Sequence, residues 1–275
     1  MTETRGKKMD IELGVIGGGN MAEAAVRGAL DRKVLAAGDV LVADPEPGRR
    51  AVFEQLGVAT TDDNPTVVSR SRRIVLAVKP QIFADLADVL GAIDPENQPI
   101  FSIMTGISNA RLAAAVGGSA RVVRVMPNTP LLVGAGMSAI APGASARDAD
   151  VEFARRIFSA AGQVVEVDEG KMDAVTAVSG SGPAYLFYLA EAMMAAAEKL
   201  GLDAEAARQL VEQTMVGAAR LLQDSDVSAA ELRARVTSRR GTTEAAIAHL
   251  EDRQVRQAVI QAIEAGARRS EELGR

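Results

Sequence analysis

The residues with the clearest chemical meaning are Gly17-Gly-Gly-Asn-Met-Ala22, which fit the pattern G-x-G-x-x-A. Gly17 permits a tight turn, Gly19 lets the backbone approach a pyrophosphate, and Ala22 lets a helix pack closely on a strand. An apolar strand precedes the motif and a helix follows it, so helix N–H groups would point at the same place. We therefore predict a dinucleotide site. Its predicted contacts are Ile16, Gly17, Gly18, Gly19, Asn20 and Met21.

Asp44 ends the next apolar segment, 22 residues after Ala22. This is near the spacing at which an acidic residue binds the adenosine ribose of NAD, and a carboxylate there would repel a 2′-phosphate. Arg49 and Arg50 follow closely, and they are either solvated helix residues or cations that neutralise such a phosphate. The residues themselves leave NAD and NADP both open.

Further contacts are expected where later strands end, because ligands of an open parallel sheet bind beyond the carboxyl ends of its strands. Lys79 stands at such an end, although a surface lysine before a turn would look the same. The additional predicted cofactor contacts are Asp44, Asn64, Ala77, Val78, Lys79, Pro80 and Thr105.

A second candidate site lies at Ser238 to Thr243, between two helical segments. Hydroxyls and backbone N–H groups at a helix start are suited to holding a carboxylate. The alternative is an ordinary helix cap, with Thr242 or Thr243 as the capping residue and Glu244 in support.

Several kinds of chemistry are excluded by composition. The chain has no cysteine, which removes disulfides, thiolate catalysis and zinc–thiolate sites. Its one histidine, His249, sits in a helical pattern and cannot build a multi-histidine metal site, so we expect no metal. The chemistry must use hydroxyls, carboxylates, amines, backbone groups or a cofactor.

The elements that must position these residues change character along the chain. Up to Val167, apolar strand-like segments alternate with helical ones, which predicts a doubly wound α/β domain with a sheet of about eight strands. The expected strands are Ile11–Ile16, Asp39–Ala43, Arg73–Val78, Pro99–Met104, Arg121–Met126, Gly136–Ala141 and Gly162–Val167.

From Lys171 onward almost everything indicates helix. The segment Ala184–Leu200 is rich in alanine and methionine on nearly all sides, and Gly201 would end it. One small domain cannot bury such a helix all round, so we infer a dimer whose subunits share a helical core. The further expected helices are Ala204–Gln223, Ser228–Arg235, Thr243–Glu251 and Gln254–Leu273.

The stretch Ala177–Tyr185, Ala-Val-Ser-Gly-Ser-Gly-Pro-Ala-Tyr, has two interpretations. It is either a phosphate loop or a junction between the two halves. Because Gly17 to Ala22 already provide a pyrophosphate site, we favour a junction whose small residues form the floor of the active site.

Charge and hydropathy limit the partners and the compartment. The formal net charge is −5, and no basic stripe suggests nucleic acid. There is no apolar run long enough to span a membrane. Met1 to Asp10 lack the apolar core of a signal peptide, so we expect a short disordered lead-in and a cytoplasmic protein.

Taken in order, the motifs resemble those of the pyrroline-5-carboxylate reductase family. The resemblance extends from Leu13 to Leu273. The segments that carry it are Ile16–Ala22, Ala77-Val-Lys-Pro80, Val125-Met-Pro-Asn-Thr-Pro130, Asp173–Tyr185, Gly241-Thr-Thr243 and Arg268–Leu273.

The resemblance implies a Rossmann domain at residues 1–168 and an all-helical dimerisation and substrate domain at 169–275. It implies a homodimer, which can extend to a ring of dimers. The implied reaction is hydride transfer from NAD(P)H, with NADP favoured and NAD possible, to the C=N bond of 1-pyrroline-5-carboxylate, giving L-proline. The implied substrate contacts are Glu169, Ser238, Gly241, Thr242 and Thr243, with Thr243 the candidate catalytic proton donor.

The residues are consistent with that reaction, because a protonated cyclic imine accepts hydride without a covalent nucleophile. One departure from the family pattern is Arg240, which stands where a glycine is usual and would disfavour a left-handed backbone angle. Two rival functions are a β-hydroxyacid dehydrogenase-like enzyme and a non-catalytic NADP sensor. The first needs a catalytic lysine that neither Lys171 nor Lys199 supplies in a matching motif, and the second needs no Gly241-Thr-Thr243 clamp.

Overall fold

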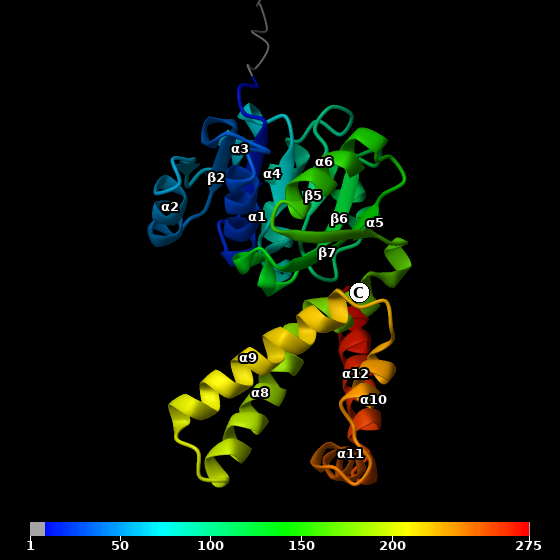
Figure 1. Cartoon of the computed structure of the whole chain (residues 1–275). Helices are drawn as coiled ribbons and strands as arrows, with labels where there is room; N and C mark the ends of the chain where they lie inside the picture. The colour runs from blue at the N-terminus through cyan, green and yellow to red at the C-terminus, as the bar shows by residue number, and fades with distance from the viewer. Residues whose placement is uncertain (1–8, 275) are drawn as a thin grey trace, which may run out of the picture. The chain divides into compact units, whose positions relative to one another are not determined.

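A computed structural model describes residues 9–274, so most of the expected disordered lead-in lies outside the described residues. The first part of the chain forms a sheet of eight strands in the order β3-β2-β1-β4-β5-β6-β7-β8 (Figure 1). The strands are β1 Leu13–Ile16, β2 Val40–Ala43, β3 Ala59–Thr61, β4 Ile74–Leu76, β5 Ile100–Ser102, β6 Val122–Met126, β7 Gly136–Pro142 and β8 Gly162–Glu166.

Seven of these strands lie where the sequence predicts them, and the eighth is β3. This short edge strand was missed, as was the helix after it, α3 (Asn64–Arg70). Helix α3 is capped by Asp63, whose carboxylate accepts the N–H of Thr66 at 2.9 Å, and Pro65 occupies its first turn. Asn64, expected in a loop, therefore begins a helix.

The order of the strands places β1 between β2 and β4, and all three run parallel. The chain leaves β1 on one side and returns to it on the other, which creates the crevice where doubly wound sheets bind ligands. Among the strands that the structure describes, only β6 and β7 pair in antiparallel fashion. Beyond it, β8 runs parallel to β7. The predicted doubly wound α/β class is confirmed, with a mixed sheet.

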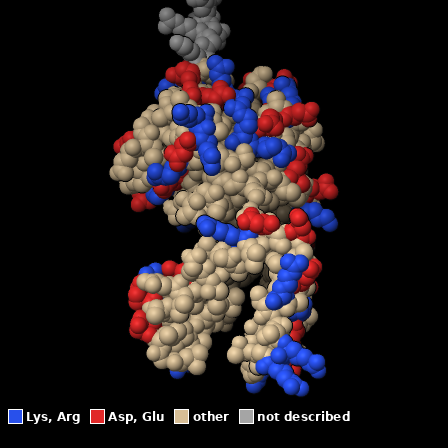
Figure 2. Space-filling view, in the orientation of Figure 1, with Lys and Arg blue, Asp and Glu red and all other residues tan. Residues whose placement is uncertain are grey.

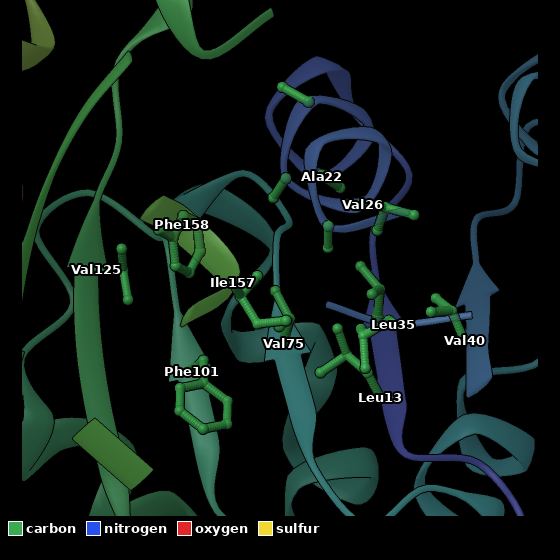
Figure 3. Close-up of a cluster of buried hydrophobic side chains, with 14 of the residues drawn as sticks. Leu13, Ala22, Val26, Leu35, Val40, Val75, Phe101, Val125, Ile157 and Phe158 are labelled. Carbon is green, nitrogen blue, oxygen red and sulfur yellow. The ribbon is translucent and has the colours of Figure 1, made fainter. Parts of the chain in front are cut away.

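Helices cover the two faces of the sheet. One apolar cluster joins β-strand side chains such as Leu13, Val75 and Phe101 to helix α1 and helix α6 (Figure 3). A second cluster lies under α3, α4 and α5. The helices of this part are α1 Asn20–Asp31, α2 Pro47–Glu54, α3 Asn64–Arg70, α4 Ala87–Gly91, α5 Asn109–Val116 and α6 Asp148–Ser159.

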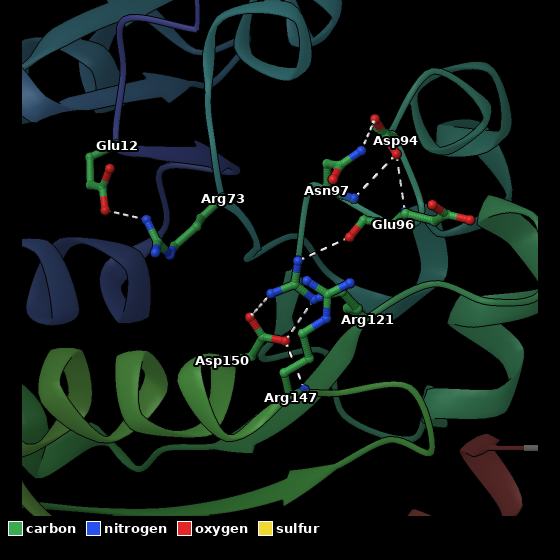
Figure 4. A network of polar contacts seen from close by, with 8 residues as sticks. All are labelled: Glu12, Arg73, Asp94, Glu96, Asn97, Arg121, Arg147 and Asp150. Atoms are coloured by element: carbon green, nitrogen blue, oxygen red, sulfur yellow. Dashed lines mark hydrogen bonds and ion pairs between the residues drawn. The ribbon is translucent and has the colours of Figure 1, made fainter.

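Charged side chains tie the segments at the amino ends of the central strands together (Figure 4). Arg121, just before β6, pairs with the buried carboxylate of Asp150 in α6 and donates to the carbonyl of Glu96 at 3.0 Å. Arg73, just before β4, pairs with Glu12 and lies over the ring of Phe153. These pairs are partly buried, and they fix the strand starts at the edge opposite the glycine-rich turn.

The second part of the chain is helical, as predicted. Helix α9 is capped by Asp203 and α10 by Ser228, while Gly201 takes a left-handed φ of 94° after α8 and so ends it as expected. The helices are α7 Met172–Val175, α8 Gly182–Lys199, α9 Ala204–Gln223, α10 Ala229–Arg235, α11 Thr242–Asp252 and α12 Val255–Gly274.

By its internal contacts the chain divides into two compact units. The first unit holds the residues up to Ser181 together with Gly266 onward, and the second holds Gly182–Ala265. The first unit thus contains the sheet and the last turns of α12. The predicted boundary at residue 168, between a nucleotide-binding domain and a dimerisation and substrate domain, stays a prediction.

Candidate active site

The glycine-rich turn is held by both strands that flank β1. The N–H of Gly17 donates to the carbonyl of Ala43 at 2.8 Å, and the N–H of Ala77 donates to Ile16 at 2.8 Å. Gly17 has a φ of 98°, and a Cβ there would lie 2.7 Å from the carbonyl oxygen of Ala77. Only glycine satisfies both the left-handed angle and this close approach.

Beyond the turn, the start of α1 faces open space. Gly19 is the residue before α1 and has no side chain to cap it, and nothing lies within 4 Å of a Cβ built there. Gly19 and Asn20 are exposed. Unbonded N–H groups at a helix start, with room beside them, are the features that bind a pyrophosphate. The residues present therefore fit a dinucleotide.

Asp44 lies beside this turn, at the end of β2. Its Oδ2 accepts the N–H of Gly18 at 2.7 Å and its Oδ1 accepts the N–H of Glu46 at 2.9 Å. Each carboxylate oxygen keeps a free lone pair. The carboxylate is therefore fixed in orientation and still able to accept hydrogen bonds from ribose hydroxyls.

The two arginines after Asp44 are not simply solvated. Arg49 Nε donates to the carbonyl of Gly18 at 2.6 Å, and its Nη2 donates to Glu23 at 2.9 Å. Arg50 Nη1 donates to the carbonyls of Asp44 at 2.8 Å and Pro45 at 3.1 Å. Both guanidinium groups therefore have protein partners beside the candidate ribose site.

The remaining predicted cofactor residues follow the same edge of the sheet. Ala77 and Val78 are half-buried directly after β4, and Lys79 is exposed before the turn η2 (Pro80–Ile82). Thr105 follows β5, and its hydroxyl contacts the Met126 sulfur at 3.9 Å. Asn64 follows β3. The carboxyl ends of parallel strands meet at one edge of a sheet, so these positions lie along that edge, and their contacts with a cofactor stay a prediction.

Glu169 belongs to the first unit and is held by two donors. Its Oε1 accepts the backbone N–H of Asn109, at the start of α5, at 2.6 Å and Arg124 Nη1 at 3.1 Å. Arg124 is a strand residue of β6 and is only 8% exposed. Both donors bind the same oxygen, Oε1, and they thereby fix the orientation of the Glu169 carboxylate.

The predicted carboxylate clamp belongs to the second unit. Gly241 is the residue before α11, and Thr242 and Thr243 are its first two residues, so neither threonine caps the helix as the alternative required. A Cβ at Gly241 would lie 2.3 Å from the Ser238 hydroxyl, which shows how closely the serine approaches the helix start. The Ser238 hydroxyl therefore lies beside the start of α11, where backbone N–H groups can bind an anion.

The loop before α11 holds the expected conflict at Arg240. This residue adopts a φ of 60°, the left-handed angle that its side chain disfavours. Its N–H donates to the carboxylate of Glu244 at 2.6 Å, and Gly241 N–H donates to the Ser238 carbonyl at 3.0 Å. The loop therefore keeps the turn despite the arginine, and two hydrogen bonds hold it.

The stretch Ala177–Tyr185 is where the first unit ends and the second begins, after Ser181. It opens with a π-helical turn, η6 (Thr176–Gly180), a feature often found at functional sites. Asn128, from the Pro-Asn-Thr-Pro segment, donates from Nδ2 to the Ser179 carbonyl at 3.2 Å. These contacts favour the junction over the phosphate loop.

Sequence reasoning missed the residues that hold the predicted ones. Arg124, Asn109, Asn128 and Glu23 each bond a candidate site residue or its neighbour. Arg124 had a signal, since it is a charged residue inside the apolar strand segment Arg121–Met126. Asn128 had one too, since it lies in the Val125–Pro130 segment that carries the family resemblance. Asn109 and Glu23 had none, because their partners are distant in the sequence.

Two further findings concern metals and membranes. Within residues 9–274, no group of three or more histidine, aspartate or glutamate side chains is arranged to hold a metal ion. None of the helices that the structure describes is both long and apolar enough to cross a membrane.

Comparisons with known proteins cover nearly the whole chain. Residues 169–273 match the family described as pyrroline-5-carboxylate reductase dimerisation, and residues 12–106 match NADP oxidoreductase, coenzyme F420-dependent. The chain is 41% identical over 260 residues to the pyrroline-5-carboxylate reductase of Haemophilus influenzae, covering 94% of this chain and 96% of that protein.

Solved structures agree. The pyrroline-5-carboxylate reductase of Coxiella burnetii is 35% identical with a TM-score of 0.86, covering 97% of this chain and 99% of that one. The pyrroline carboxylate reductase of Plasmodium falciparum, solved with NADP bound, is 29% identical with a TM-score of 0.85, covering 98% and 100%.

Proposed function

The chain belongs to the pyrroline-5-carboxylate reductase family, and from that premise we propose that it reduces the C=N bond of 1-pyrroline-5-carboxylate with NAD(P)H, giving L-proline. The observation that carries this proposal is likeness over 94% of the chain, which includes both the glycine-rich turn and the Gly241-Thr-Thr243 segment. The enzyme is an oxidoreductase acting on a cyclic imine.

The nucleotide would lie along the carboxyl edge of β1, β2, β4 and β5. The start of α1 would bind the pyrophosphate, and Asp44 would accept the ribose hydroxyls. NADP is the cofactor named for the matching family and for the Plasmodium structure, and NAD remains possible. When bound, the nicotinamide supplies the hydride. The other proposed contacts are Ile16, Gly17, Gly18, Gly19, Asn20, Met21, Asn64, Ala77, Val78, Lys79, Pro80 and Thr105.

The substrate carboxylate would be held at the start of α11. Backbone N–H groups there, together with the hydroxyls of Ser238, Thr242 and Thr243, offer several donors to one anion. Gly241 permits this because a side chain there would collide with Ser238. Thr243, half-buried at the second position of α11, would donate a proton toward the ring nitrogen.

Glu169 would supply negative charge to the substrate ring. Its Oε1 is occupied by Asn109 and Arg124, which would leave the other oxygen for the protonated nitrogen. An imine carries positive charge only when protonated, and a nearby carboxylate favours that form. Arg124 acts here as a positioning residue.

We further propose that the active form is a homodimer, and that dimers can associate into a ring. Helix α8 has no buried residue in the single chain, although its side chains are largely apolar. Figure 2 shows the surface of α8 and α9 as mostly uncharged in that view. Exposed apolar surface of this kind marks an interface. The proposed location of the enzyme is the cytoplasm.

A direct assay tests the function. Purified protein is mixed with 1-pyrroline-5-carboxylate and either NADPH or NADH, and the loss of reduced nicotinamide is followed while L-proline is measured by chromatography. We expect equal amounts of nicotinamide oxidised and proline formed. A β-hydroxyacid with the oxidised cofactor serves as the negative control. Cofactor binding without any imine reduction would instead support the sensor function, and oxidation of the hydroxyacid would support the dehydrogenase.

A further inference from the structure

We propose that Asp44 and Glu23 together make this enzyme bind NADH more tightly than NADPH, while still accepting both. Asp44 would repel the 2′-phosphate of NADPH directly. Glu23 would keep Arg49 in an ion pair, so that Arg49 could not bind that phosphate. This inference rests on the proposed function, because it assumes that the nucleotide lies at the carboxyl edge of β1 and β2.

Asp44 cannot easily turn away from a bound nucleotide. Its two oxygens each accept one backbone N–H, from Gly18 and Glu46, at 2.7 and 2.9 Å. Rotating the carboxylate would leave these N–H groups without their acceptors. The free lone pairs suit two ribose hydroxyls, whereas a 2′-phosphate would bring about two negative charges against a fixed anion.

Arg49 is the first cation after Asp44 in the sequence and could otherwise pair with the 2′-phosphate. Glu23 already binds Arg49. Arg49 bonds the Gly18 carbonyl through Nε and Glu23 through Nη2, and its side chain is partly buried. Partial burial by itself would raise the pKa of Glu23, but hydrogen bonds from Arg27 and Arg49 outweigh it and lower that pKa. Glu23 is therefore ionised at neutral pH and holds Arg49 by charge.

Arg50 provides limited compensation. Its Nη1 donates to two carbonyls of the β2–α2 turn, at Asp44 and Pro45. Moving it toward a phosphate would leave these carbonyls without their donor. The other nitrogens of Arg50 would still attract a 2′-phosphate at longer range, which would let NADPH bind without reversing the preference for NADH.

The test measures cofactor binding without the imine, so it does not depend on turnover. The affinities of NADH and NADPH are measured by calorimetric titration, because the chain has no tryptophan to report binding by fluorescence. 5′-AMP and adenosine 2′,5′-bisphosphate are titrated in the same way to isolate the 2′-phosphate. We expect NADH to bind about tenfold more tightly than NADPH at low salt, and the difference to shrink as salt is added.

Two variants divide the effect between its two causes. Asp44→Asn should strengthen NADPH and weaken NADH, which inverts the preference. Glu23→Ala should release Arg49 and lower the ratio of the NADPH to the NADH dissociation constant by about fivefold. Because Glu23 lies in the first turn of α1, its removal can strengthen both cofactors, so the ratio is the readout.

Two controls make the Glu23 result specific. Arg27→Ala removes the other partner of Glu23, which is bonded at 3.0 Å, and should leave the ratio unchanged. The double variant Glu23→Ala/Arg49→Ala should restore the original ratio, since the released cation is then absent.

Three outcomes overturn the proposal. They are tighter binding of NADPH by the unmodified protein, an Asp44→Asn variant with unchanged preference, and a Glu23→Ala variant with an unchanged ratio. Each leaves the reductase function standing. If neither nucleotide binds at all, the proposed function itself fails, so the two failures are distinguishable.

Discussion

At the scale of single residues, Thr243 is the hydroxyl whose removal most directly tests the proton transfer. We predict that Thr243→Val, which keeps the shape of the side chain, lowers kcat by about a hundredfold or more. The affinity for NADPH should hardly change, because the residue belongs to the start of α11 and not to the glycine-rich turn. Steady-state kinetics and calorimetric titration measure the two quantities.

Two variants accompany this test. Thr243→Ser keeps a hydroxyl and should retain much of the activity, whereas Thr242→Val removes the neighbouring hydroxyl and should act mainly on KM. Near-normal turnover by Thr243→Val would remove this residue from the mechanism.

Arg240 offers a second prediction, about stability. Its left-handed φ of 60° costs an ordinary residue about 1 kcal/mol relative to glycine. Arg240→Gly should therefore raise the free energy of unfolding by about that amount, measured by denaturant unfolding at a fixed protein concentration. Arg239→Gly, one position earlier and without a positive φ, should give no such gain. Equal effects of the two substitutions would mean that the backbone angle stores no strain.

Single residues were predictable where a local pattern dictates them. Gly17 follows from the motif, because a tight turn with a positive φ requires glycine. The place of Asp44 beside that turn follows from motif spacing, and its contact with ribose stays a prediction. Glu23 was not predictable in its role, and for Arg124 the sequence signals only a charged residue in an apolar strand segment, not its partner. Each acts through a partner brought near by tertiary folding, and no spacing in the sequence encodes that contact.

At the scale of elements, the packing of α1 on α6 depends on Gly28. A Cβ at this position would lie 2.6 Å from the Cβ of Ala161, just after α6. We predict that Gly28→Ala costs about 1 to 3 kcal/mol of stability through overpacking, despite the better helix propensity of alanine. Thermal unfolding measures the loss.

Gly91 provides a matched control, because it also lies in a helix, α4, and a Cβ there meets nothing within 4 Å. Gly91→Ala should be neutral or stabilising. If both alanines were tolerated equally, the contact with Ala161 would not constrain the two helices.

Most elements followed from the sequence, because long periodic segments carry a strong signal. Strand β3 did not, since it has three residues at the edge of the sheet and no buried side chain. The antiparallel direction of β7 was also missed. The connection from β6 contains only the short turn η4 (Thr129–Val133), and so short a link cannot make the crossover that a parallel strand needs.

At the scale of the whole molecule, dimer formation should depend on the apolar surface of α8. Phe187 and Tyr188 are 62% and 76% exposed in the single chain. We predict that Phe187→Glu shifts the protein toward monomers in analytical ultracentrifugation, because burying an unpaired carboxylate is unfavourable. Turnover should fall in parallel if the active form is the dimer.

Glu152→Lys is the control, because it also changes the charge of an exposed residue but lies on the surface of α6. It should leave the sedimentation profile unchanged. A dimer that survives Phe187→Glu would place the interface on another surface. The need for a partner subunit was predictable from the apolar composition of α8. The number of subunits was not, because it depends on the shapes of folded surfaces, which no local sequence pattern indicates.

The position of α12 has a consequence for how the protein is made. Its last residues belong to the first unit, where Ser270 donates to the Asp173 carboxylate at 2.7 Å and Gly274 lies against Gly106. The strands of the sheet are translated early, yet they gain these contacts only after α12 has been translated. During synthesis the first unit therefore lacks these contacts until α12 has emerged from the ribosome. Loss of residues 266–274 would therefore remove contacts from the part of the chain that is synthesised first.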